Sequence, residues 1–297
     1  MKYIAAFDIG GTAIKYGIIN SDGIILESSV MPTEAELGPE VWMEKIVSRV
    51  KEMEARYTLS GVAISSTAMI DSDSGKVFFS LPQLPRYTGF DIKGFLEERC
   101  NLPVTVENDV NSVALAESIS GAGKGYSSVL SIAIGTGVGG GFTENAKLLR
   151  GNTFSACEVG YIKVSDGTLE SLGSARALSR RVESYKNAPA GSWNGYMIEE
   201  GVKSGDADSI KALNITVNAI AEGLVTLSYI LNPAVIVLGG GIIKMEGLVS
   251  MIRERYLTLI NPLIGSRTKI VKAQYDNEAG MLGAYYNFKE KHPEMKL

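Results

Sequence analysis

Two glycine-rich turns, 125 positions apart, are the first feature of this sequence that could do chemistry. One contains Gly10 and Gly11, and the other runs from Gly135 through Thr136 to Gly137. Such turns expose backbone N–H groups, which can bind phosphate oxygens. Glycines are also common in hairpins, so one turn alone would indicate only a hairpin. Two turns in register, each after an apolar run, favour phosphate binding.

Charged residues flank the first turn. Asp8 immediately precedes it, and Lys15 follows after Thr12. Mg²⁺ keeps several of its waters and takes few carboxylates, so Asp8 is a candidate Mg²⁺ partner through water. Lys15 could lie near the same phosphates. The alternative is that Asp8 only caps a hairpin.

A third glycine run follows the apolar residues 235–238. Gly239, Gly240 and Gly241 would allow close approach by a flat adenine or a ribose. A tight connection from strand to helix is the alternative. Residues 135–140 match G-x-G-x-x-G, but a dinucleotide fingerprint must open a helix, and residues 141–145 indicate a strand and a turn.

Asn108 and Asp109 lie where a predicted strand gives way to a predicted helix. Ligand sites in α/β domains favour the carboxyl ends of strands. Asp109 could accept a proton from an attacking hydroxyl, and Asn108 could orient that substrate. Both are preferred helix caps, which is the structural alternative. Glu158 and Glu170 could bind sugar hydroxyls, or they are surface acids.

Composition excludes several classes of function. The chain has 297 residues, 45% hydrophobic and 21% charged, which indicates about two folded domains. A net charge of −4 argues against nucleic-acid binding through a basic face. The single histidine, His292, argues against a Ser/His/Asp triad or a multi-histidine metal site. Because Cys100 and Cys157 are the only cysteines, a disulfide scaffold is excluded and a reducing, cytoplasmic compartment is expected.

Neither a signal peptide nor a membrane span is expected. Residues 1–7 enter a predicted strand without a basic start or a long apolar stretch. Residues 223–243 are uncharged and long enough to span a bilayer, but Asn232 and Pro233 interrupt them. We interpret this stretch as a helix, a turn, a buried strand and a glycine turn.

Apolar spacing predicts the same three-strand antiparallel meander twice. The strands are residues 3–9, 13–19 and 24–30, and then 128–134, 138–143 and 148–149. Other predicted elements are helices 39–57, 90–99, 110–118, 207–231 and 279–289, strands 61–66, 104–106 and 235–238, and a hairpin at 71–79. The predicted domains are residues 1–118, with a helix at about 280–297 packing back on them, and residues 119–279.

Together these motifs resemble the ROK family of bacterial sugar kinases, glucokinases and repressors. The resemblance covers nearly the whole chain and rests on residues 6–15 (AFDIGGTAIK), 107–117 (ENDVNSVALAE), 134–141 (IGTGVGGG), 158–161 (EVGY) and 237–241 (VLGGG). It implies an α/β fold, the actin-like, ribonuclease H-like ATPase fold, with two domains around a central cleft.

The resemblance also implies roles for individual residues. Asp109 would be the catalytic base. The substrate-binding residues would be Asn108, Glu158, Tyr161, Glu170 and Gln83. The ATP-binding residues would be Asp8, Gly10, Gly11, Thr12, Lys15, Gly135, Thr136, Gly137, Gly239, Gly240 and Gly241, with Mg²⁺ near Asp8.

Two departures from the family pattern bear on the substrate. Tyr161 stands where the family usually has a histidine that meets sugar and zinc, and the family's cysteine-rich zinc loop is absent from the short segment 164–168. We therefore expect no zinc site. The short, zinc-free chain resembles the β-glucoside kinase branch, in which these losses could open the anomeric end of the sugar to an aglycone.

The sequence thus predicts an ATP-dependent sugar kinase that uses Mg²⁺ and phosphorylates the 6-hydroxyl of glucose or of a glucose-ended β-glucoside such as cellobiose. An N-acetylmannosamine kinase and a catalytically silent sugar-binding sensor are alternatives. An actin-like or chaperone-like ATPase and a dinucleotide oxidoreductase represent other classes. Neither a nucleic acid nor a membrane is expected as a partner, and the resemblance implies a homodimer.

Overall fold

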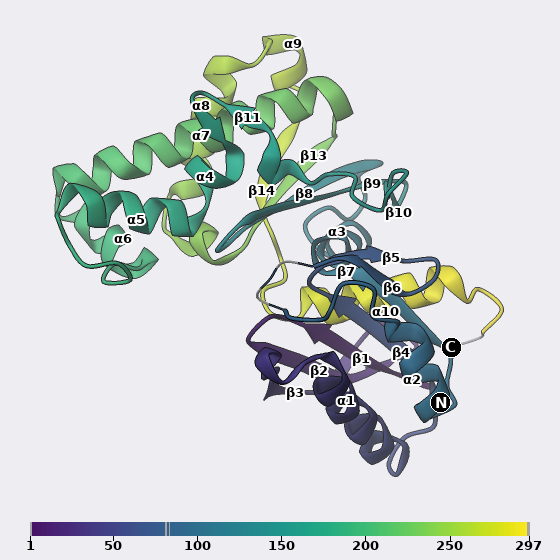
Figure 1. The fold of residues 1–297 in the computed structure, drawn as a ribbon. Coiled ribbons are helices and arrows are strands. Elements are labelled where there is room, and N and C mark those ends of the chain that lie inside the picture. The colour runs from purple at the N-terminus through teal and green to yellow at the C-terminus, as the bar shows by residue number, and fades with distance from the viewer. Residues whose placement is uncertain (1, 81, 83, 296–297) are drawn as a thin grey trace. The chain divides into compact units, whose positions relative to one another are not determined.

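The computed structural model describes residues 2–80, 82 and 84–295, and the chain divides into two compact units. Unit 1 consists of Met1–Ile119, Arg150–Ala156 and Asn277–Leu297. Unit 2 consists of Ser120–Leu149 and Cys157–Asp276. Each contains one five-stranded mixed sheet (Figure 1).

The sheet of unit 1 has the order β3-β2-β1-β4-β7. Its strands are β1 (Tyr3–Ile9), β2 (Ala13–Asn20), β3 (Ile25–Pro32), β4 (Leu59–Ser66) and β7 (Val104–Asn108). The first three form the predicted antiparallel meander, while β4 and β7 run parallel to β1. A small hairpin, β5 (Met69–Asp71) and β6 (Lys76–Phe79), confirms the one predicted at 71–79.

Helices cover both faces of this sheet (Figure 1). On one face, α1 (Pro39–Glu54) and α2 (Ile92–Cys100) bury Trp42, Ile46 and Leu96 against inward-facing strand residues such as Phe7. On the other, α3 (Asp109–Ile119) contacts α10 (Ala279–Lys291), which lies against β1, β4 and β7. The short helix η1 (Ala35–Leu37) precedes α1.

The second sheet repeats the first, with the order β10-β9-β8-β13-β14. Its strands are β8 (Ser128–Ile134), β9 (Val138–Glu144), β10 (Lys147–Leu148), β13 (Val235–Gly239) and β14 (Lys269–Lys272). Both ends of β8 lie 125 residues after the ends of β1, and the meander is again followed by strands parallel to its first member. The predicted internal repeat is therefore confirmed.

Unit 2 adds helices that were not predicted from the sequence. They are α4 (Leu169–Gly173), α5 (Ala175–Tyr185), α6 (Gly195–Lys203), α8 (Leu248–Leu259) and α9 (Pro262–Gly265), with short helices η2 (Val159–Tyr161) and η3 (Gly241–Lys244). A two-stranded sheet of β11 (Lys163–Val164) and β12 (Gly167–Thr168) precedes α4. The core of the unit lies between one face of its five-stranded sheet and these helices together with α7.

The long apolar helix α7 (Ala207–Leu231) is a core helix of unit 2. It begins after Asp206, whose side chain accepts a hydrogen bond from the Ser209 N–H, and it ends where Asn232 adopts a left-handed conformation before Pro233. Among the described residues it is the one helix long and apolar enough to cross a membrane, but 56% of its most apolar window is buried within the protein. The interruption predicted at Asn232 is confirmed.

Two glycines allow α10 to lie very close to its neighbours in unit 1. A Cβ added to Gly283 would overlap the backbone carbonyl of Ser112 on α3. A Cβ added to Gly280 would overlap the carboxylate of Asp8 on β1. Because backbone cannot move aside as a flexible side chain can, Gly283 is a point of obligatory close contact.

We predict that Gly283→Ala lowers the midpoint of thermal denaturation by about 5–10 °C, because overpacking against backbone costs about 2–3 kcal/mol. Gly195→Ala is the matched control, since Gly195 is also helical and a Cβ there would meet no atom within 4 Å. The control should be neutral or slightly stabilising, because alanine favours helix over glycine. Equal midpoints for both variants would contradict the packing described here.

Candidate functional site

In unit 1, the candidate residues gather at the carboxyl ends of three neighbouring parallel strands. Asp8 of β1 is in register with Ser65 of β4, and Ser65 is in register with Glu107 of β7. Parallel strands place their carboxyl ends at one edge of a sheet, so Asp8 and Asn108 lie at the same edge. The sequence predicted both residues, but it carried no signal for Ser65.

Asp8 is held by three surrounding groups. The Ser65 hydroxyl donates to its Oδ1 over 2.8 Å, and the Lys15 Nζ donates to its Oδ2 over 3.3 Å. Gly280 of α10 lies so close that a side chain there would overlap the carboxylate. Asp8 is thus a single, partly exposed carboxylate with a fixed orientation. That arrangement fits an Mg²⁺ ion that keeps its waters and takes few carboxylate contacts.

The first glycine turn is tied to the chain that follows β3. The Thr33 hydroxyl donates to the Gly10 carbonyl over 2.7 Å, and the Thr33 N–H donates to the Thr12 carbonyl over 3.0 Å. Gly11 is exposed, its φ lies outside the left-handed region, and a Cβ there would meet no atom within 4 Å. Nothing within the unit therefore requires glycine at position 11, and the space beside its backbone fits an approaching phosphate.

Asn108 caps α3 and also contacts the candidate base. Its Oδ1 accepts from the N–H groups of Val110 and Asn111 over 2.9 and 3.0 Å. Its Nδ2 donates to Asp109 Oδ1 and to the Ala68 carbonyl, each over 2.9 Å. Asn108 is therefore a helix cap, as the alternative interpretation of the sequence expected. The same side-chain amide also holds one oxygen of Asp109. Ala68 has a φ of 144°, which is uncommon for alanine and indicates local strain.

Beneath this pair lies a buried ion pair that the sequence did not indicate. Glu107 is 1% exposed, and its Oε2 accepts from Arg150 Nε over 2.8 Å. Its Oε1 accepts from the Asn108 N–H over 3.0 Å and from Asn111 Nδ2 over 3.1 Å. Arg150 also donates to Asn287 Oδ1 of α10 over 3.1 Å. Every oxygen of the buried carboxylate is therefore paired, as burial of a charge requires.

In unit 2, the second glycine turn is held by α4 and α5. Glu170 Oε2 accepts from the Val138 N–H over 3.0 Å, and the Ala175 N–H donates to the Gly135 carbonyl over 2.9 Å. A Cβ at Gly137 would lie 2.5 Å from Glu170 Oε2, whereas one at Gly135 would meet no atom within 4 Å. Gly137 therefore makes room for Glu170, while the space beside Gly135 and exposed Thr136 is open.

The third glycine run lies beside the second turn, at the ends of β13 and β8. Gly239 is in register with Ala133 of β8. Gly240 has a φ of 94°, and a Cβ there would overlap the Ile134 backbone, so the fold itself requires glycine at this position. A Cβ at Gly241 would meet no atom within 4 Å. The tight connection therefore accounts for Gly240, and open space remains beside Gly241.

Glu158 and Glu170 interact within unit 2. Glu158 immediately precedes η2, whose Gly160 packs against the Val138 carbonyl and the Glu170 side chain. Loss of surrounding water, followed by the negative charge of Glu170, raises the pKa of Glu158 above its ordinary value. Tyr161, at the end of η2, is 66% exposed. These side chains provide carboxylates that could accept hydrogen bonds from sugar hydroxyls.

Gln83, the remaining predicted sugar-binding residue, lies outside the described residues. The G-x-G-x-x-G match opens strand β9 and not a helix, so the requirement for a dinucleotide fingerprint is not met. The turn at Ser165 and Asp166 joins β11 to β12 in the segment where the zinc loop was expected to be absent. Across residues 2–80, 82 and 84–295, no group of three or more His, Cys, Asp or Glu is placed to hold a metal ion.

We predict that Glu170→Gln lowers the pKa of Glu158 part of the way to its ordinary value, because it removes the neighbouring charge and leaves the burial unchanged. Carbon-13 NMR titration of the Glu158 carboxyl measures this. Asp208→Asn, which removes a partly exposed charge at the start of α7, should leave the Glu158 titration unchanged. If the Glu158 pKa were the same in both variants, the two carboxylates would not interact as described.

Comparison with known proteins adds independent information. The model of the ROK family matches residues 4–291. An uncharacterised protein of Clostridium perfringens is 39% identical over 291 residues, which covers 98% of this chain and 99% of the relative. A β-glucoside kinase of Klebsiella pneumoniae is 31% identical over 295 residues, covering 97% of this chain and 96% of the relative.

Solved structures agree with the fold. A candidate N-acetylmannosamine kinase of Listeria monocytogenes superposes with a TM-score of 0.87 at 29% identity, covering 98% of this chain and 99% of that one. A ROK family glucokinase of Streptomyces griseus, in complex with glucose and AMPPNP, gives a TM-score of 0.81 at 28% identity. The match covers 95% of this chain and 97% of that one. With the repeated sheets, these matches confirm the predicted two-domain, actin-like α/β fold.

Proposed function

The chain belongs to the ROK family, and we propose that it is an ATP-dependent sugar kinase that phosphorylates the 6-hydroxyl of glucose or of a glucose-ended β-glucoside such as cellobiose. The observation that carries the proposal is the placement of Asp8 and Asn108–Asp109 at one strand edge of unit 1. The β-glucoside kinase relative and the glucokinase bound to glucose and AMPPNP support the substrate class.

In this proposal Asp109 is the general base. It accepts the proton of the sugar hydroxyl as that oxygen attacks the γ-phosphoryl group of ATP. Asn108 fixes one Asp109 oxygen through its Nδ2, and the buried Glu107 fixes the Asn108 backbone. Because the carboxylate is oriented before the sugar arrives, less ordering is required during the reaction. Asn108, Glu158, Glu170, Tyr161 and Gln83 are proposed to contact the sugar.

The phosphates of ATP are assigned to the two glycine turns. The open space beside Gly11 and Gly135 allows phosphate oxygens to reach backbone N–H groups, and Thr12, Lys15 and Thr136 lie in the same segments. Gly239–Gly241 are assigned to the adenosine. Asp8 would hold Mg²⁺ through water, and the ion when bound would offset phosphate charge. Catalysis then consists mainly of positioning and charge stabilisation.

N-acetylmannosamine is the second candidate substrate. The solved candidate N-acetylmannosamine kinase has a TM-score of 0.87 with this chain, and Tyr161 replaces the histidine that the ROK resemblance led us to expect. A tyrosine at this position changes the hydrogen bonding offered to substituents near the anomeric centre. We further propose that the protein works as a homodimer in the cytoplasm, where cysteines such as Cys100 and Cys157 stay free.

We predict that Asp109→Asn lowers kcat by about 100- to 10 000-fold, the usual contribution of a general base, while sugar binding is largely kept. A coupled assay of ADP release measures kcat, and calorimetric titration with the sugar measures binding.

Glu54→Gln is the matched control, because Glu54 is an exposed carboxylate at the end of α1 in the same unit. The control should keep normal turnover. Near-normal turnover of Asp109→Asn would remove Asp109 from the role of base.

A further inference from the structure

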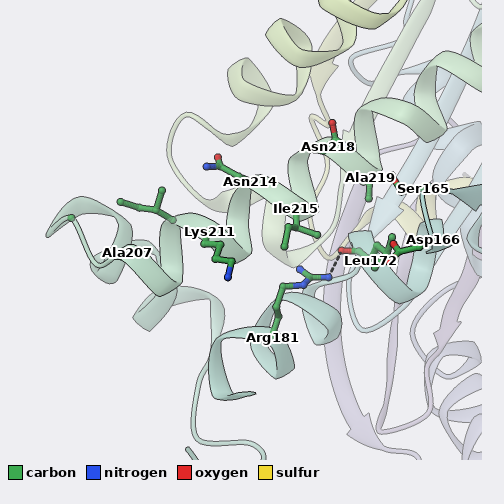
Figure 2. Close-up of a pocket in the computed structure, with 12 residues that line it drawn as sticks. Ser165, Asp166, Leu172, Arg181, Ala207, Lys211, Asn214, Ile215, Asn218 and Ala219 are labelled. Atoms are coloured by element: carbon green, nitrogen blue, oxygen red, sulfur yellow. Dashed lines mark hydrogen bonds between the residues drawn. The ribbon is translucent and has the colours of Figure 1, made fainter. Parts of the chain in front are cut away.

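Unit 2 has a pocket of about 950 Å³ that includes none of the residues assigned above (Figure 2). Leu172 of α4 and Ile215 and Ala219 of α7 provide apolar walls. Arg181 of α5 and Lys211 of α7 extend into the same space. A pocket of this size, largely apolar with a few polar groups, is typical of small-molecule sites.

Arg181 is a partly buried cation that lacks a carboxylate partner among the residues described. Its Nη1 donates to Thr216 Oγ1 over 2.9 Å and to the Ala212 carbonyl over 3.2 Å. Its Nη2 donates to the Leu172 carbonyl over 3.1 Å. A guanidinium has five N–H groups, so its Nε–H and one Nη2–H remain for a further acceptor. Burial lowers the pKa of Arg181, as expected for a cation whose charge is not balanced nearby.

Lys211 supplies a second positive charge to this pocket. Its Nζ lies 4.6 Å from the centre of the Tyr185 ring, and Tyr185 follows Arg181 by one turn of α5. Arg181 and Lys211 therefore approach the pocket from facing helices. Asp166, on the β11–β12 turn, is the acidic residue in the lining. Two cations and one acid therefore line the pocket itself, while a second acid, Glu222, lies behind the lining and accepts from the Ser165 hydroxyl and the Asn218 amide, each over 2.7 Å.

We propose that this pocket binds a phosphate monoester of a small organic molecule. The phosphoryl group accepts from the free edge of Arg181 and from the Lys211 ammonium, and the organic part lies on Leu172, Ile215 and Ala219. A phosphoryl dianion matches two cations in charge, and its three oxygens can accept from two directions, whereas a planar carboxylate presents two oxygens in one plane.

The pocket shares α4 and α5 with the second glycine turn. Arg181 contacts the Leu172 carbonyl of α4, and the same short helix carries Glu170, which accepts from the Val138 N–H of the turn. The first residue of α5, Ala175, donates to the Gly135 carbonyl. A ligand that binds the free edge of Arg181 shifts the guanidinium and with it the Leu172 carbonyl that it holds, so we expect the KM for ATP to rise. This regulatory consequence rests on the proposed kinase function, whereas binding in the pocket does not.

Binding is tested by NMR titration of the full chain with inorganic phosphate and glucose 6-phosphate, at constant ionic strength and with sodium chloride as the reference salt. We expect amide signals of residues 205–219 to shift with both phosphates. Arg181→Met should weaken this binding by about tenfold or more, the usual value of a charge-assisted hydrogen bond. Arg180→Met removes the neighbouring exposed charge of α5 and should have no effect.

Arg181→Met removes three hydrogen bonds and could therefore destabilise the unit. Two further variants change exposed residues of the pocket wall, which make no such contacts with the core in the described part of the chain. Lys211→Met should weaken phosphate binding, and Asp166→Asn should strengthen it. Shifts confined to residues 8–15 and 135–141, shifts equal to those with chloride, or loss of binding on dilution from dimer to monomer would each overturn the proposal. Pocket binding without an effect on the KM for ATP would overturn only its coupling to the glycine turn.

Discussion

The close approach of α10 to β1 and α3 is the contact on which unit 1 depends. Helix α10 covers one face of a sheet whose first strand is Tyr3–Ile9, so unit 1 is built from segments that lie far apart in the sequence. Gly283 allows backbone contact with Ser112, and Gly280 leaves room for the Asp8 carboxylate. Asn287 of the same helix accepts a hydrogen bond from Arg150, the partner of Glu107 beneath Asn108 and Asp109. Helix α10 therefore lies directly against Asp8 and is connected to Asp109 through Arg150, Glu107 and Asn108.

The ion pair of Glu107 and Arg150 connects this packing to the chemistry. Replacing both members of a buried ion pair by apolar residues of similar volume is often neutral or stabilising, so the value of this pair lies more in orientation than in stability. Glu107 holds the backbone of Asn108, and Asn108 in turn holds Asp109. In unit 2, Glu170 has a comparable place, since it supports a glycine turn and lies beside Glu158. The acids near each turn therefore hold the backbone of the candidate site in place.

The elements predicted well from the sequence are those in which the local pattern and the packing agree. The two meanders and α7 have clear apolar periodicity, and their predicted bounds agree with the structure to within about two residues. Helix α4 was missed because it has only five residues, and α5 because Ser174 alone separates it from α4; a side-chain cap, from Thr168 or Ser174, marks the start of each helix. Asp8, Asn108 and the glycine turns were recognisable as candidates from residue type and position. Ser65, Arg150 and Gly280 were not, since their importance depends on contacts distant in sequence.

We propose above all that phosphoryl transfer by this chain requires a sugar acceptor. The most direct measurement is ADP release from Mg²⁺·ATP by the 297-residue chain, in parallel assays without sugar and with glucose, cellobiose or N-acetylmannosamine. We expect ADP release to depend on sugar, and the sugar that gives the highest kcat/KM identifies the substrate. Equal release with and without sugar, or no release with any of them, would contradict the claim that the chain is a sugar kinase.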